Sequence, residues 1–144
     1  MALQLLDLGL MGEFTHVSLN DSALDKDADG FVEEWDKYIE GGVSAPPIKN
    51  GEEPTIFRLK PVDDAELDAK IRGKLHGVGS AWAVETPCYS LVGIDNLRDK
   101  DGHPFELKFE RVDGFRKVCK EHRNLLGREL LNELGLVCIG RQSP

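Results

Sequence analysis

Apolar side chains recur at helical spacing in two stretches of the first half of the chain. The first stretch predicts a helix over 31–40, ended by Gly41-Gly42, and its shared face carries Phe31, Trp35, Tyr38 and Ile39. The second predicts a helix that begins at the capping sequence 63–66 and carries a narrow stripe of Leu67, Ile71 and Leu75. Each stripe indicates a helix with one buried face.

The longest helical pattern predicts a single C-terminal helix over 114–135. Asp113-Gly114 opens it, Gly135 serves as its C-cap, and its apolar stripe consists of Phe115, Val118, Cys119, His122, Leu126, Leu130 and Leu134. Four basic side chains lie outside that stripe on one helical face: Lys117, Lys120, Arg123 and Arg128. This face is either a docking face for an acidic partner or a plain solvated face.

Alternating apolar and polar residues predict strands elsewhere. A half-buried strand is expected in 13–19, with Thr15, Val17 and Leu19 on one face, and another over 55–60, stopped by Pro61. A β-hairpin is expected over 89–109, because two β-type runs flank an Asp-Gly turn and Phe105, Leu107 and Phe109 alternate with polar residues. The stretch 80–86 fits either a strand or the end of a helix.

These elements predict an α+β fold: a single small domain with β-hairpins, about three helices and an extended N-terminal region. Residues 1–54 would hold the extended segment, an acidic loop, a short helix and a proline-rich arm. Residues 55–144 would form the α+β core. The arm, 43–54, is either a linker within a monomer or a segment that lies on a neighbouring molecule.

Composition narrows the possible partners. The chain has 144 residues, of which 40% are hydrophobic, and its net charge of −8 opposes binding to a nucleic-acid backbone. No apolar run is long enough for a membrane span, and Asp7 interrupts the apolar start, which is a poor match to a secretory signal. The three cysteines fit a reducing compartment: Cys119 and Cys138 as small buried residues, and Cys88 as a candidate to pair with Cys138.

The sharpest chemical motif is the acidic loop Asp25-x-Asp-x-Asp-Gly30. It resembles a calcium-binding loop of the EF-hand or dockerin type, in which oxygen ligands occupy positions 1, 3, 5, 7, 9 and 12 and glycine occupies position 6. The candidate metal ligands for Ca²⁺ are therefore Asp25, Asp27, Asp29, Phe31 through its carbonyl, Glu33 through water, and Asp36.

The same residues also fit a solvated acidic turn before the helix at Phe31. Position 12 is an aspartate instead of the longer glutamate, and 17–24 carries β-type and turn residues where an incoming helix should be. No nucleophile, base and oxyanion donor come together in the sequence, and no histidine spacing fits zinc, so no catalytic residue and no other cofactor is expected. An enzyme would need a site built from residues far apart in the chain.

Two further segments carry a family resemblance across residues 13–135: Pro54-Thr-x-Phe-x-Leu-x-Pro61 and Val92-Gly-Ile-Asp-x-Leu-x-Asp-x-Asp-Gly102. With the proline-rich arm between them and the start of the chain, they resemble small tail-assembly and minor structural proteins of tailed bacteriophages. That resemblance implies a non-enzymatic protein that binds other phage structural proteins or copies of itself, forms oligomers, and resides in the virion or the host cytoplasm. The acidic loop departs from the pattern.

Overall fold

The computed structural model describes residues 13–43, 45–60, 66–67, 69, 71 and 79–142. Within them, helices and two antiparallel sheets alternate along the chain, which confirms the predicted α+β class. The first helix, α2 (Phe31–Ile39), follows the prediction closely. Gly41 then adopts a φ of 84°, so the expected glycine stop is confirmed too. Of the predicted helix after 63, Leu67 and Ile71 are buried as expected, while 61–65 and Leu75 lie outside the described residues.

The larger sheet has the order β1-β2-β3, formed by β1 (Phe14–His16), β2 (Ile56–Leu59) and β3 (Leu91–Asp95). Both predicted strands near 13–19 and 55–60 are therefore present. The prediction of which face of β1 is buried is wrong, because Thr15 is exposed and His16 is buried. Pairing ends at His16, and the backbone of Val17 bonds to a side chain of α2 instead. The alternation thus breaks before Leu19.

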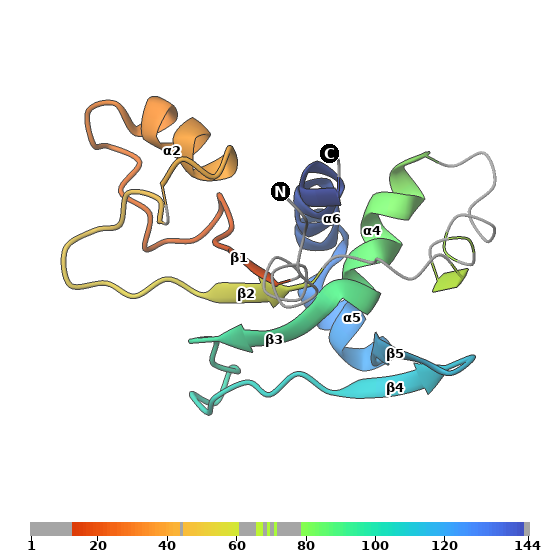
Figure 1. Cartoon of the computed structure of the whole chain (residues 1–144). Coiled ribbons are helices and arrows are strands. Elements are labelled where there is room, and N and C mark those ends of the chain that lie inside the picture. Colours follow the sequence, from red (N-terminus) through yellow and green to blue (C-terminus); the bar gives the residue numbers. More distant parts are fainter. Residues whose placement is uncertain are drawn as a thin grey trace.

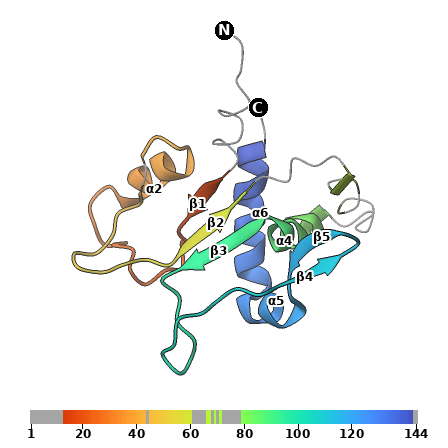
Figure 2. The ribbon, with the colours of Figure 1, turned by 60° about the horizontal axis from the view of Figure 1, so that its bottom comes forward.

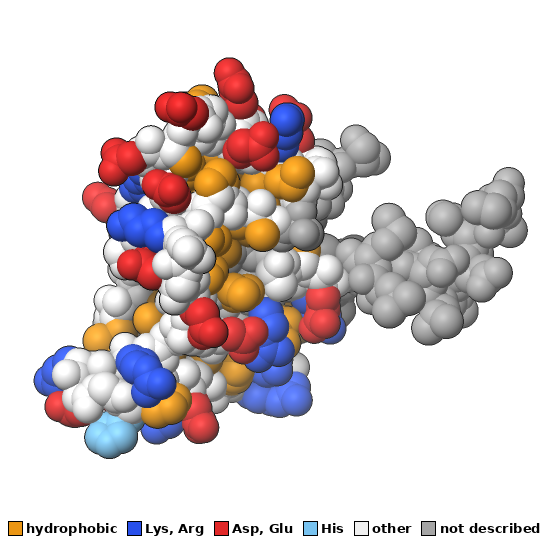
Figure 3. All heavy atoms as spheres, turned by 90° about the vertical axis from the view of Figure 1, so that its left-hand side faces the viewer, with side chains coloured by type: hydrophobic (Ala, Val, Ile, Leu, Met, Phe, Trp, Pro, Cys, Tyr) orange, Lys and Arg blue, Asp and Glu red, His pale blue; other side chains and the backbone are white. Residues whose placement is uncertain are grey.

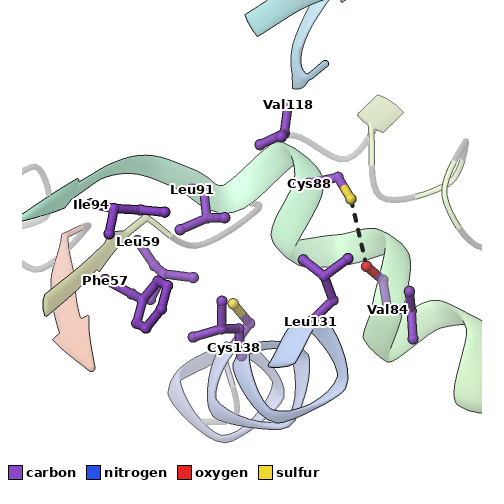
Figure 4. Packing of buried hydrophobic residues seen from close by; sticks show 10 residues of the cluster. Phe57, Leu59, Val84, Cys88, Leu91, Ile94, Val118, Leu131 and Cys138 are labelled. Carbon is purple, nitrogen blue, oxygen red and sulfur yellow. Dashed lines mark hydrogen bonds between the residues drawn. The ribbon is translucent and has the colours of Figure 1, made fainter. Parts of the chain in front are cut away.

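Helix α4 (Gly79–Ser90) and helix α6 (Arg128–Gln142) lie side by side against this sheet, while α2 lies off its β1 edge (Figures 1 and 2). Residues 80–86 are thus helical, one of the two alternatives. Figure 4 shows side chains of β2, β3, α4 and α6 gathered in one core, with Leu59, Leu91, Leu131 and Cys138 almost fully buried. This core holds the sheet and the two long helices together.

Gly135 marks the place where α4 and α6 come closest. The sequence predicts it as a C-cap, which is wrong: α6 continues past it to Gln142. A Cβ built on Gly135 would overlap the carbonyl of Ala83. Pro87, four residues after Ala83, has no N–H to bond to that carbonyl, so the backbone of α4 is open to close approach by α6.

The predicted helix over 114–135 is instead a hairpin followed by two helices: β4 (Phe109–Val112), β5 (Phe115–Val118), α5 (Lys120–Leu126) and α6. Asp113 and Gly114 have φ values of 53° and 88°, and two successive positive values are the signature of a tight type I′ hairpin turn. Gly127, with a φ of 84°, then separates the two helices. Local turn chemistry therefore overrides the helical spacing of Phe115 and Val118.

The predicted hairpin over 89–109 is also wrong. β3 pairs with β2, and residues 105–108 belong to neither sheet. Pairing is confined to the residues next to the Asp-Gly turn, where Arg98 and Pro104 form a bridge and the N–H of Phe105 donates to the carbonyl of Leu97 at 2.7 Å. Phe109 belongs to β4 and pairs with Val118.

The proline-rich arm pairs with its own chain. Leu24 and Ile48 form a bridge, the N–H of Lys49 donates to the carbonyl of Ala23 at 2.8 Å, and the N–H of Asp25 donates to Pro47 at 3.1 Å. Val43 and Ile48 also pack on a second small core formed by Val17, Leu24 and Tyr38. Ala23, Leu24 and the second small core therefore hold this part of the arm against its own chain.

Candidate binding groove

A groove of about 500 Å³ lies between α2, α6 and the turn that follows β1. Its lining consists of His16, Leu19, Asn20, Trp35, Ile39, Glu40, Glu133, Leu136 and Val137. Figure 3 shows apolar side chains gathered in a hollow on the face that carries α2. Three of the lining residues are large and apolar yet exposed: Leu19 by 41%, Ile39 by 43% and Leu136 by 57%. Exposed apolar groups that share one concave surface are typical of interaction sites.

Helical periodicity places the two walls. Trp35 and Ile39 are four residues apart and so lie on one side of α2, and Glu133, Leu136 and Val137 do the same on α6. Tyr38 anchors the first wall, because its hydroxyl accepts the N–H of Val17 at 2.9 Å. The groove therefore depends on the seating of α2 against the chain after β1.

A polar pair, with His16 buried and Glu133 partly exposed, forms the floor of the groove. His16 is only 2% exposed, and its Nε2 donates to Oε2 of Glu133 at 2.7 Å. The hydroxyl of Ser18 donates to Oε1 of Glu133 at 2.8 Å, and the N–H of Leu19 donates to Oε2 at 3.0 Å. Burial on its own would raise the pKa of Glu133, but these hydrogen bonds outweigh it and lower the pKa, which keeps the carboxylate charged.

Aromatic rings hold the histidine in place. The imidazole of His16 stacks on Tyr38 at 6.1 Å between ring centroids and meets Trp35 edge-on at the same distance. Trp35 and Tyr38 are themselves in contact at 5.4 Å. The floor is therefore pre-organised, with hydrogen bonds on one side and ring contacts on the other.

The hydroxyl of Ser18 and the imidazole of His16 share one hydrogen-bond partner, the carboxylate of Glu133. A serine nucleophile needs a hydrogen bond to its base, but Ser18 and His16 both donate to Glu133 instead of contacting each other. The polar atoms on the floor are used in holding the groove together. The remaining lining is mostly apolar, with Asn20 and Glu40 as its polar members, and it fits a nonpolar side chain.

Of the predicted calcium ligands, Asp25, Asp27 and Asp29 precede α2, and Phe31, Glu33 and Asp36 lie within it. Gly30 adopts a φ of 75°, as position 6 of such a loop requires, and Phe31 is the first residue of the helix. No side chain caps the helix, although Glu33 lies in its first turn. The carboxylates of Asp25, Asp27, Asp29, Glu33 and Asp36 do not gather three together within 4.8 Å. Calcium binding by this loop remains a prediction.

Within the described part of the chain, the only group of three potential metal ligands is Asp99, Asp101 and His103, all exposed. Oδ1 of Asp99 accepts the N–H groups of Asp101 at 2.9 Å and His103 at 3.0 Å, so this carboxylate closes the loop after β3. The sequence shows the same Asp-x-Asp-Gly pattern here, and its role in the structure is that of a turn.

The expected basic helical face is not formed. Lys117 lies on β5, where its Nζ is 2.5 Å from Glu85, and Arg123 on α5 is 3.0 Å from the other oxygen of Glu85. Burial alone would lower the pKa of Lys117, but its bond to Glu85 outweighs this and raises it. These two cations attach the hairpin and α5 to α4. Lys120 and Arg128 remain exposed.

The cysteines are free in the structure. Cys88 and Cys138 are buried in the main core and Cys119 is half-buried, so the expectation that Cys138 is a buried small residue is confirmed. Burial raises the pKa of the Cys88 and Cys138 thiols to about 11.

Sequence reasoning missed the groove because its three walls come from distant segments. The one available signal was Glu133, a charged residue beside the apolar stripe of the last helix.

Across the described residues, no helix combines the length and apolar composition that crossing a bilayer requires. No protein-family model, curated protein or solved structure matches this chain.

Proposed function

We propose that this protein works by binding another protein at the groove, as a non-enzymatic structural or assembly protein of a tailed bacteriophage. The phage setting comes from the sequence resemblance. The binding role comes from the geometry of one surface, the groove between α2 and α6.

The exposed apolar lining of the groove supports the binding role. Three apolar side chains around Trp35 are open to solvent: Leu19, Ile39 and Leu136. Exposure of apolar surface to water is unfavourable in free energy, and burial against a partner would remove this cost. Each apolar Å² removed from water contributes roughly 25 cal/mol, so a partner that covers these side chains gains from each of them. The rigid floor formed by His16 and Glu133 lowers the ordering cost of binding.

The test is co-expression of the chain with the products of its neighbouring genes, followed by size-exclusion chromatography with light scattering. We expect a complex with one of these products that Leu136→Gln weakens at least tenfold. The matched control is Leu125→Gln, because Leu125 is 67% exposed on α5 and does not line the groove. A monomer that forms no complex, or equal behaviour of the two variants, would contradict the proposal.

Calcium binding at Asp25–Asp36 is the second candidate, supported by the positive φ of Gly30 directly before α2. Calcium would have to draw the carboxylates together, and binding to the folded state raises the melting temperature. We expect a rise with calcium that Asp27→Ala removes and that magnesium reproduces only weakly. An unchanged melting temperature would eliminate this candidate.

A further inference from the structure

Unpaired carboxylates flank the groove on both walls. Asp36 and Glu40 are four residues apart and therefore lie on one side of α2, and Glu129 lies one turn before Glu133 on α6. All three are exposed, and none forms an ion pair with another described residue. Figure 3 shows mostly acidic side chains on the part of this face that carries α2, whereas Lys and Arg side chains lie among the acidic ones lower on the same face. An apolar surface bordered by uncompensated negative charge favours a partner with positive charge beside its apolar residues.

The backbone at the groove floor is already occupied. The N–H of Val17 donates to Tyr38, and the N–H of Leu19 donates to Glu133. A partner that adds a strand to a sheet edge needs such donors to be free. Here the available contacts are side chains on two helices, α2 and α6, which suits the docking of a third helix between them.

The charges also argue against a second copy as the occupant of this surface. Two copies that met face to face across the groove would bring Asp36, Glu40 and Glu129 of each molecule together, and the chain carries a net charge of −8. Like charges brought together in this way oppose association. A different protein with basic residues fits better.

We infer that the groove binds an amphipathic helix of a partner protein, with apolar residues at i, i+3 or i+4 and i+7 and with Lys or Arg on either side of them. This inference rests on the proposed function and specifies the partner. The apolar residues would contact Leu19, Ile39 and Leu136, and the basic residues would lie beside Asp36 and Glu40 or beside Glu129.

The test uses three fluorescently labelled helical peptides and measures their binding by anisotropy. The first has a leucine stripe flanked by Lys and Arg, the second has Glu in place of every Lys and Arg, and the third scrambles the first at equal composition. We expect the basic peptide to bind at least tenfold more tightly than either of the others, and to weaken as salt is added.

Variants locate the site. The double variant Asp36→Asn, Glu40→Gln should lower the affinity for the basic peptide about three- to tenfold, as expected for the loss of two exposed ion pairs. The control, Glu106→Gln with Glu110→Gln, removes the same charge from exposed positions outside the groove and should have little effect. Leu136→Gln should also weaken binding.

The outcomes separate this inference from the proposed function. If the basic and acidic peptides bind equally and Leu136→Gln weakens both, the groove binds apolar helices and the charge inference is overturned. If the basic peptide binds but Leu136→Gln changes nothing, it binds elsewhere and the inference is overturned as well. If no peptide binds, the inference about a basic helix is also overturned. The proposed function is then tested separately, by complex formation with the neighbouring gene products.

Discussion

Replacing Gly135 by alanine tests the packing that holds the two long helices together. The new Cβ would overlap the carbonyl of Ala83 and would lie 2.7 Å from its Cα. Carbon atoms pack at about 3.5–4.0 Å, and the carbonyl oxygen and carbon of Ala83 would lie closer still, so α4 and α6 would have to separate by at least about 1 Å. Leu131, Leu134 and Cys138, which are buried on the same helix, would lose contacts as a result.

The expected cost follows from two opposing effects. Overpacking of a core costs about 1–3 kcal/mol, and the direct overlap with a backbone carbonyl places this site at the upper end. Alanine is favoured over glycine within a helix by about 1 kcal/mol, which offsets part of that cost. We therefore expect the free energy of unfolding to fall by about 2 kcal/mol and the melting temperature to fall by about 6 °C.

Urea denaturation followed by circular dichroism measures this change. The control is Gly42→Ala, because a Cβ at Gly42 would lie 3.4 Å from the carbonyl oxygen of Lys37, which needs only a slight adjustment. We expect Gly42→Ala to stay within about 0.5 kcal/mol of the wild type. A Gly135→Ala variant as stable as the wild type, or more stable, would refute the close approach of α4 and α6.

Three further outcomes are expected. Glu133→Gln should lower the free energy of unfolding by about 2 kcal/mol, since it removes the charge from several hydrogen bonds. Because the pKa of Glu133 is lowered by folding, its contribution is complete above the pKa of the unfolded chain and is lost as the pH falls. The difference from the wild type should therefore shrink below about pH 4, and a constant difference in urea titrations would speak against it. Gly114→Ala should cost about 1–2 kcal/mol in thermal unfolding, because the turn needs a φ of 88° there, whereas an unchanged melting temperature would argue against the type I′ turn. At neutral pH a thiol reagent should modify Cys119 well before Cys88 and Cys138, and rapid native-state reaction of all three would contradict their burial.

The elements predicted well are those that short-range signals determine. The helix at 31–39 has an apolar face and a glycine stop within twelve positions, and β2 lies between turn residues and Pro61. The segment 113–118 carries two competing signals, because Phe115 and Val118 fit helical spacing while Asp113-Gly114 fits a hairpin turn. The hairpin forms, and two successive positive φ values at Asp113 and Gly114 give the type I′ turn whose twist matches that of the paired strands β4 and β5.

Long-range pairing explains the other differences. β3 is followed by residues with a strand-like pattern, yet it pairs with β2, which is distant in sequence, and the loop after β3 closes on itself. The groove combines His16, Trp35 and Glu133, whose proximity no local pattern encodes. Glu133 in particular has the sequence context of a solvated helix residue, and its role arises only because the chain after β1 turns toward it.

The long connection between β1 and β2 has a practical consequence for isolating the natural partner. Closing a loop costs little more when a few residues are added, so this connection should accept an inserted epitope tag. Gly51 is the best position, because it is exposed, has open space around it and lies outside the groove lining. A tag placed there would let the protein and anything bound at the groove be recovered with both helical walls unaltered.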